Sequence, residues 1–168
     1  YYLEHHLGWS GVAVEAQVEF AADYARHRPR TRFVSMFAGD TEDGTIEFYV
    51  PKDWHGLNAS AHRDLVTGPV DSRRIATTTL TAILDTAAIA RIDFLSMDIE
   101  DSEPAALRGF DIARFRPALV CIEDHQAVRH PILEYFSQHG YKLVAKYLRA
   151  DVNNLYFEPQ DPQAPPQR

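Results

Sequence analysis

The sequence is poor in cysteine and in basic residues. Its 168 residues include one cysteine, Cys121, so no internal disulfide and no cysteine-rich zinc site can form. The 17 Lys and Arg side chains are outnumbered by 24 Asp and Glu, which gives a formal net charge of −7. Sequence-independent binding to nucleic acid needs a basic surface, and we therefore expect no nucleic-acid partner.

Long apolar runs and two common catalytic motifs are also missing. No apolar run approaches the roughly 20 residues of a membrane-spanning helix, and no signal segment opens the sequence, so we expect a cytoplasmic protein without a membrane span. The sequence lacks a Gly-x-x-x-x-Gly-Lys-Ser/Thr phosphate-binding loop and a Gly-x-Ser-x-Gly nucleophile elbow. The absence of these two motifs argues against phosphate-loop nucleotide hydrolysis and serine-dependent hydrolysis.

The composition is that of a globular domain, with 45% hydrophobic and 24% charged residues. At this length one compact domain is expected. We place it at residues 1–158. The last ten residues, 159–168, carry four prolines and are expected to form a disordered tail.

Apolar strands alternate with helical periods along the chain. The expected strands are 10–15, 32–37, 45–50, 93–99, 118–122, 141–148 and 154–157, and the expected helices are 1–7, 17–27, 78–90, 102–108 and 131–140. Apolar strands separated by helices indicate a parallel sheet covered on both faces. The predicted fold class is therefore α/β, a doubly wound, mostly parallel Rossmann-like sheet with a closing antiparallel strand.

Two connections carry further expectations. Asp43-Gly44 is a turn dipeptide that predicts a hairpin between the strands at 32–37 and 45–50. The 24 residues of 51–74 show no period, and loops of that length are usually lids or binding loops. We expect this loop to select the substrate.

Acidic side chains follow three of the predicted strands, at the edge where open α/β sheets bind ligands. Asp98 and Glu100 follow one strand and share a face, as do Glu123 and His125 on the next. If these strands are neighbours, the groups converge and could bind Mg²⁺, accept a substrate proton or favour a cationic ligand. Asp98, Glu123 and His125 are the catalytic candidates, and Asp98 and Glu123 are also the candidate metal ligands. Glu15 either binds ribose hydroxyls or is an exposed acid at a helix start.

The segment Leu95-Ser-Met-Asp-Ile-Glu-Asp-Ser-Glu-Pro-Ala-Ala-Leu-Arg-Gly109 carries a family resemblance. It resembles the Leu-Lys-Ile-Asp-Val-Glu-Gly-Ala-Glu-x-x-x-Leu-x-Gly segment of FkbM-type S-adenosylmethionine-dependent methyltransferases. Further blocks agree in order and spacing, at 2–15, 78–84 and 119–123, the last followed by Gly140-Tyr141. Together they cover most of residues 1–157.

The resemblance implies a class I methyltransferase fold that binds S-adenosylmethionine and methylates a hydroxyl of a small molecule, sugar or natural product. By that resemblance Glu15 would hold the ribose hydroxyls, Asp98 would lie beside the sulfonium, and Glu123 would line the same cleft. The expected cofactor-binding residues are Glu15, Ala38, Asp40 and Asp98. A divalent metal (Mg²⁺) and a homo-oligomer are both compatible with these features.

The sequence also departs from the family. Ser96 replaces the usual Lys, Asp101 the usual Gly, and Pro104 a usual Leu or Val. The family's first strand and its Asp-x-Gly-Ala turn would precede Tyr1, so we expect either an upstream extension or impaired cofactor binding. Two alternatives therefore stand beside methyl transfer: a non-catalytic module with this fold, and a nucleotide-sugar-binding enzyme that uses Glu15 on ribose.

Overall fold

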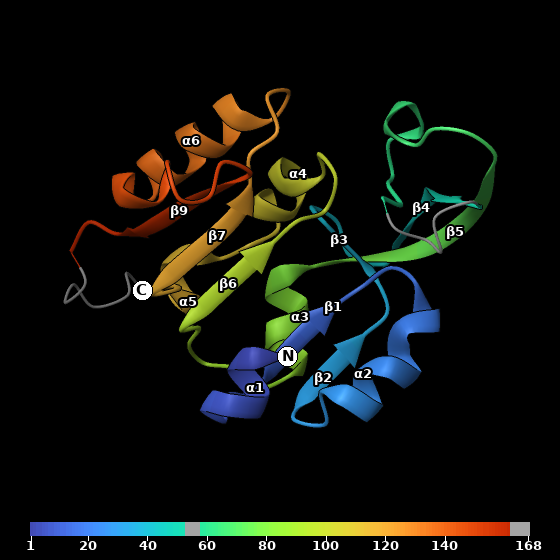
Figure 1. The fold of residues 1–168 in the computed structure, drawn as a ribbon, viewed down its shortest axis with the longest axis horizontal. Helices are drawn as coiled ribbons and strands as arrows, with labels where there is room; N and C mark the ends of the chain where they lie inside the picture. Colours follow the sequence, from blue (N-terminus) through green and yellow to red (C-terminus); the bar gives the residue numbers. More distant parts are fainter. Residues whose placement is uncertain (53–57, 162–168) are drawn as a thin grey trace.

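The computed structural model describes residues 1–52 and 58–161. Its helices and strands are α1 (Tyr2–Leu7), β1 (Gly11–Val14), α2 (Ala21–His27), β2 (Thr31–Val34), β3 (Phe37–Gly39), β4 (Gly44–Pro51), β5 (Val70–Thr79), α3 (Leu80–Thr86), β6 (Phe94–Met97), α4 (Glu103–Arg108), α5 (Ile112–Phe115), β7 (Leu119–Glu123), α6 (Arg129–Gln138), β8 (Tyr141–Leu143) and β9 (Asn154–Pro159) (Figure 1). Three 3-10 turns complete them: η1 (Val18–Phe20), η2 (Arg63–Leu65) and η3 (Ala145–Tyr147). The alternation of helices and strands confirms the α/β class.

The single doubly wound sheet that we predicted is wrong in one respect, because the described strands form three sheets. These are β1-β2, β3-β5-β4 and β6-β7-β9-β8. In the described residues β1 pairs only with β2, and β6 pairs with β7 but with no strand on its other side. Both of these pairs are parallel, and Figure 1 shows β1 and β6 pointing toward the same end of the molecule. The closing strand β9 runs antiparallel to β7, as predicted.

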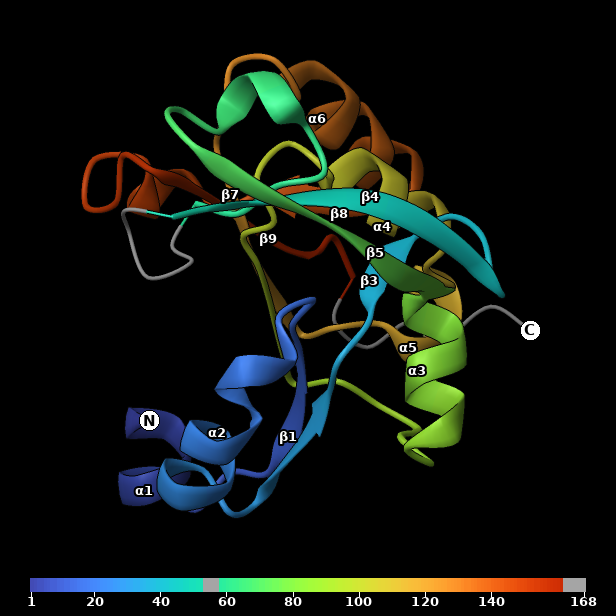
Figure 2. The same ribbon diagram turned by 90° about the vertical axis from the view of Figure 1, so that its right-hand side faces the viewer.

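The hairpin predicted between the strands at 32–37 and 45–50 is wrong, because the second of these strands, β4, pairs with β5. β4 pairs antiparallel with β5, from Gly44 opposite Thr77 to Pro51 opposite Val70, while β3 runs parallel to β5. A Cβ at Gly44 would lie 2.6 Å from Thr77 Oγ1, so a larger residue here would require the Thr77 side chain to shift. The strand expected at 32–37 is divided into β2 and β3, which lie in different sheets. The β4–β5 hairpin lies across one end of the α/β part, above β1 and β2 in Figure 2.

The region expected to be a loop, 51–74, is shorter than predicted because β5 begins at Val70. Residues 53–57 of that loop lie outside the described residues. At the other end of the chain β9 extends to the buried Pro159, and 162–168 lie outside the described residues, so the predicted tail stays a prediction.

The main core lies on one face of the β6-β7-β9-β8 sheet. Side chains that alternate along β7 and β9, such as Val120, Ile122 and Phe157, are almost fully buried and pack in one cluster with Phe136 of α6. The rings of Phe136 and Phe157 stack with centroids 4.1 Å apart. This core supports the ends of β6 and β7, from which the acidic side chains extend.

Candidate functional site

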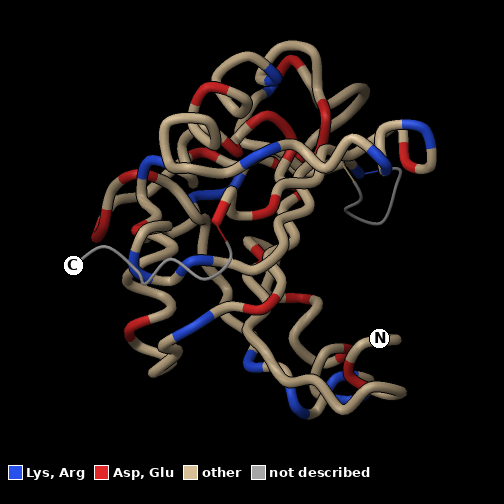
Figure 3. Tube along the Cα trace, turned by 90° about the vertical axis from the view of Figure 1, so that its left-hand side faces the viewer, with Lys and Arg blue, Asp and Glu red and all other residues tan. Residues whose placement is uncertain are grey.

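The ends of β6 and β7 bring together the acidic group predicted from the sequence. The two strands pair in parallel with Met97 opposite Ile122, so Asp98 and Glu123 follow at the same edge. We call Asp98, Glu100, Asp101, Glu103, Glu123 and His125 the acidic rim. In Figure 3 several acidic positions lie close together in the upper half of the molecule.

The loop from Asp98 to Ser102 is held in an unusual conformation. Glu100 and Asp101 have φ angles of 55° and 67°, in the left-handed region that favours glycine. The side chain of Glu103 accepts a hydrogen bond from the Ile99 N–H at 2.8 Å, and the Ser60 hydroxyl donates to the Glu100 carbonyl at 3.1 Å. Glu103, at the start of α4, thus fixes one end of the loop, and Ser60, in the β4–β5 connection, fixes its middle.

Asp101 and His125 form a pair at the rim. His125 Nδ1 lies 2.7 Å from Asp101 Oδ1. An ionised carboxylate can only accept a hydrogen bond, so Nδ1 carries the proton and Nε2 of the neutral ring is the acceptor. The Asp101 hydrogen bond raises the pKa of His125 above its ordinary value, and the nearby charges of Glu123 and Glu100 add to this. We predicted His125 as a candidate, and interpreted Asp101 as a residue at a helix start and as an extra carboxylate at the mouth of the pocket, without pairing it with His125.

The rim carries more negative charge than its described partners neutralise. Burial raises the pKa of Glu123 to about 7, helped by the charges of Asp98 and Glu100. Burial also raises the pKa values of Glu100 and of the fully buried Glu103. One carboxylate oxygen of Glu103 and one of Glu123 are buried without a hydrogen-bond partner among the described residues. Such a group favours a bound cation because a positive charge relieves the repulsion between carboxylates.

The rim should make the protein less stable as the pH rises. The folded pKa of Glu123 lies above that of the unfolded chain, so the folded state binds more protons between about pH 4.5 and pH 7 and stability falls across that window. We expect Glu123→Gln to flatten this fall and to raise the melting temperature at pH 8 by about 2–4 °C, as for about 1 kcal/mol in a domain of this size. Scanning calorimetry of both proteins from pH 4 to 8 measures the melting temperature at each pH.

The matched control is Glu134→Gln on the exposed face of α6. An identical pH slope in Glu123→Gln and in the unmodified protein would show that Glu123 does not carry the effect.

The other predicted cofactor residues lie on different elements. Glu15 follows β1, is partly buried, and accepts a hydrogen bond from the Gln17 N–H at 2.8 Å, which orients its carboxylate. Ala38 is buried in β3 at 8% exposure. Asp40 is exposed and pairs with Arg108, whose NH2 and Nε lie 2.8 and 3.1 Å from Asp40 Oδ2. The structure therefore brings Asp98, Glu123 and His125 together, and places Glu15, Ala38 and Asp40 in other parts of the fold.

A metal site gains no support. Within residues 1–52 and 58–161, no three or more His, Cys, Asp or Glu side chains are arranged to hold a metal ion. Asp98 and Glu123, the candidate metal ligands, are thus not part of such a group in the described residues. In the same described ranges, none of the helices has both the length and the apolar character needed to cross a bilayer.

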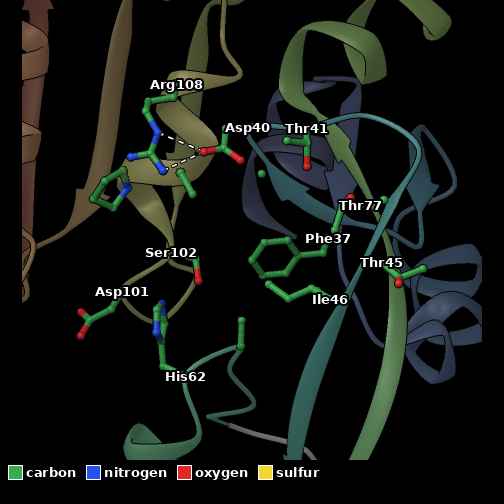
Figure 4. A pocket seen from close by; sticks show the side chains of 15 residues that line it. Phe37, Asp40, Thr41, Thr45, Ile46, His62, Thr77, Asp101, Ser102 and Arg108 are labelled. Atoms are coloured by element: carbon green, nitrogen blue, oxygen red, sulfur yellow. Dashed lines mark hydrogen bonds and ion pairs between the residues drawn. The ribbon is translucent and has the colours of Figure 1, made fainter.

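A cavity of about 380 Å³ opens beside the rim, between the β4–β5 hairpin and α4 (Figure 4). Helix α4 packs closely on β3 here. A Cβ at Gly109, which directly follows α4, would lie 2.2 Å from the Gly39 carbonyl oxygen, so glycine permits this approach. Asp101 belongs to both the rim and the cavity lining. The sequence showed no sign of this cavity, since its walls come from segments distant in the chain.

In open α/β sheets, ligands bind at the carboxyl ends of the strands, and this is where the domain carries its group of carboxylates. Comparison with protein families is more specific: residues 1–143 match the methyltransferase FkbM domain. The chain belongs to this family. No curated protein and no solved structure gives a significant match.

Family membership implies the class I methyltransferase fold and S-adenosylmethionine as the methyl donor. The acidic rim fits that donor, because a sulfonium is a cation and the rim has unpartnered buried carboxylate oxygens. The φ of 67° at Asp101 lies in the left-handed region that favours glycine, the residue that the family resemblance led us to expect here.

Proposed function

We propose that the protein transfers the methyl group of S-adenosylmethionine to a hydroxyl oxygen of a small molecule, sugar or natural product. The observation that carries the proposal is the pair of Asp101 and His125 at a rim that favours a cationic donor, with no hydrogen bond to His125 Nε2 from the described residues.

Two parts of the chain would hold the donor. Glu15, at the end of β1, would accept the two ribose hydroxyls, and Asp98, at the end of β6, would lie beside the sulfonium. Both strands point toward the same end of the molecule (Figure 1). Ala38 and Asp40 are further proposed contacts, on β3 and just after it.

The chemistry of the rim suits hydroxyl methylation. When bound, S-adenosylmethionine supplies an activated methyl group on its sulfonium. His125 Nε2 then accepts the proton that the acceptor hydroxyl loses, while Asp101 accepts the hydrogen bond of Nδ1–H and stabilises the charged ring. Asp98 and Glu123 orient the acceptor and keep the rim negative. His125 is favoured as the base because it is 46% exposed and its orientation is set by Asp101.

Calorimetry and turnover together test the proposal. Titration of S-adenosylmethionine or S-adenosylhomocysteine into the protein should release or absorb heat with one binding site per chain. The absence of any heat would count against the cofactor. Undiminished turnover by Asp98→Asn would remove Asp98 from the site.

A non-catalytic binding module is the second candidate. The observation in its favour is that β1 and β6 each pair on one side only in the described residues, so the strand ends that would share the cofactor lie in separate sheets. Cofactor binding without methyl transfer to any hydroxyl acceptor would support this candidate. Competition between nucleotide sugars and S-adenosylmethionine would instead support a nucleotide-sugar-binding enzyme.

A further inference from the structure

The cavity between the β4–β5 hairpin and α4 has the walls of a ligand site. Its volume of about 380 Å³ lies within the roughly 300–1,000 Å³ of typical small-molecule sites. Fifteen residues line it, from β3, β4, β5, the segment around His62 and the start of α4 (Figure 4). Of the proposed cofactor contacts, Asp40 lines the cavity, whereas Glu15, Ala38 and Asp98 do not, so the cavity adjoins the proposed cofactor contacts at β3 and does not include those at β1 and β6.

Two buried hydroxyl groups in the lining are unused. Ser102 is 3% exposed and Thr77 is 6% exposed, and the hydroxyl oxygen of each has no hydrogen-bond partner among the described residues. Ser102 occupies the N-cap position of α4, where a serine oxygen usually accepts from a backbone N–H of the first turn, but it makes no such bond. Figure 4 shows its hydroxyl pointing into the space between α4 and Phe37. A buried hydroxyl without a partner is costly, and a ligand hydroxyl would satisfy it.

The charges of the lining are already paired. Arg108 is the only Lys or Arg among the described lining residues, and its guanidinium binds Asp40 through two nitrogens. Asp101 is paired with His125. An anionic ligand would have to break the Arg108 pair and would face two carboxylates, so the cavity selects against phosphate and carboxylate groups.

The remaining wall is partly apolar. Its apolar part is formed by Phe37 and Ile46 together with Pro104 and Ala105 of α4, and the polar Thr41, Thr45 and His62 also belong to the lining. A sugar ring has hydroxyl groups at its edge and C–H groups on its faces, so it can bond to Ser102 and Thr77 while packing against Phe37.

We propose that this cavity binds the methyl acceptor and that the acceptor is an uncharged sugar ring, not a sugar phosphate or a nucleotide sugar. That the bound sugar is the methyl acceptor rests on the proposed methyl transfer. The binding of a sugar in this cavity does not depend on it. Asp101 connects the cavity with the rim: it is one of the residues that line the cavity, and its carboxylate, which points away from the space between Ser102 and Phe37 in Figure 4, contacts His125 Nδ1.

Saturation-transfer NMR on the full chain without cofactor tests this site. The probes are uncharged methyl glycosides of glucose, galactose, mannose, fucose and rhamnose, together with glucose 6-phosphate and UDP-glucose. We expect saturation of at least one methyl glycoside and none of the two phosphorylated sugars. Ser102→Ala should weaken that binding about fivefold, as for about 1 kcal/mol from one hydrogen bond. Ala105→Phe should abolish it by filling the cavity.

The matched controls are Ser137→Ala and Ala113→Phe, at exposed positions of α6 and α5, which should bind as the unmodified protein does. Circular dichroism checks the fold of Ala105→Phe, and Ser102→Ala adds no bulk. No saturation of any methyl glycoside, stronger binding of the phosphorylated sugars, or equal binding by Ser102→Ala and the unmodified protein would each overturn the proposal.

The calorimetric test of the cofactor separates the two proposals. Heat with S-adenosylmethionine but no glycoside binding overturns the sugar site and leaves methyl transfer standing. Glycoside binding that depends on Ser102, without heat from the cofactor, supports the sugar site and contradicts methyl transfer.

Discussion

Replacing His125 with glutamine is expected to lower the rate of methyl transfer by about 10²–10⁴-fold, the usual contribution of a general base. Glutamine keeps a polar side chain of similar length but cannot take up the proton of the substrate hydroxyl near neutral pH. The affinity for S-adenosylmethionine should stay within about twofold of that of the unmodified protein, because the proposed ribose and sulfonium contacts come from Glu15 and Asp98. Formation of S-adenosylhomocysteine measures the rate, and calorimetry measures the affinity.

Asp101→Asn distinguishes positioning from a purely structural role. The Asp101 carboxylate raises the pKa of His125, so its removal lowers that pKa. Because the base acts in its neutral form, turnover rises with pH, and the midpoint of this rise should move to lower pH in Asp101→Asn. A structural role alone would reduce turnover without moving the midpoint.

His139→Gln is the matched control for His125→Gln, since His139 is exposed at the end of α6 and away from the rim. If His125→Gln turns over as fast as this control, His125 is not the base, and Glu123 and Asp98 are the remaining candidates.

Replacing Glu15 with glutamine should weaken S-adenosylmethionine binding about 100-fold. A carboxylate accepts hydrogen bonds from both ribose hydroxyls, and bonds to a charged group contribute about 1.5–3 kcal/mol each. Glutamine offers one acceptor oxygen and no charge, and a loss of about 3 kcal/mol corresponds to about 100-fold in the dissociation constant. Its oxygen can still accept from the Gln17 N–H, so the local backbone is retained.

Isothermal titration calorimetry with S-adenosylhomocysteine measures this change without turnover. Glu134→Gln makes the same substitution at an exposed site on α6 and should bind normally. Equal affinity in the two variants would show that Glu15 does not contact the ribose, and would favour its alternative interpretation as an exposed acid near a helix start.

The acidic rim was predictable from local pattern. Asp98 and Glu123 each follow a short apolar strand, and the direct pairing of β6 with β7 places them at one edge. We expected strand alternation to place Asp98 on one face with Glu100, and Glu123 with His125, but β6 ends at Met97 and β7 at Glu123, so the loops that follow the strands set the positions of Glu100 and His125. The placement of Asp98 and Glu123 needs no contact between remote segments beyond that one strand pair.

The pairing of β4 was not predictable in the same way. The Asp43-Gly44 turn predicts the start of β4 correctly, but it does not determine which other strand pairs with β4. The partner is β5, which is separated from β4 by 18 residues of connection and pairs with it from Gly44 opposite Thr77 to Pro51 opposite Val70. The role of Asp101 was missed for a related reason, since its partner His125 is 24 residues away.

The sequence by itself determined the α/β class, the family and the carboxylates that follow β6 and β7, because alternation, apolar runs and motif spacing are local properties of the chain. Only the tertiary structure decided the division of the described strands into three sheets, the Asp101–His125 pair, and the cavity in which the Ser102 and Thr77 hydroxyls have no partner among the described residues. Each of these depends on which distant segments meet, and that is set by packing across the whole fold, which no short window of residues contains.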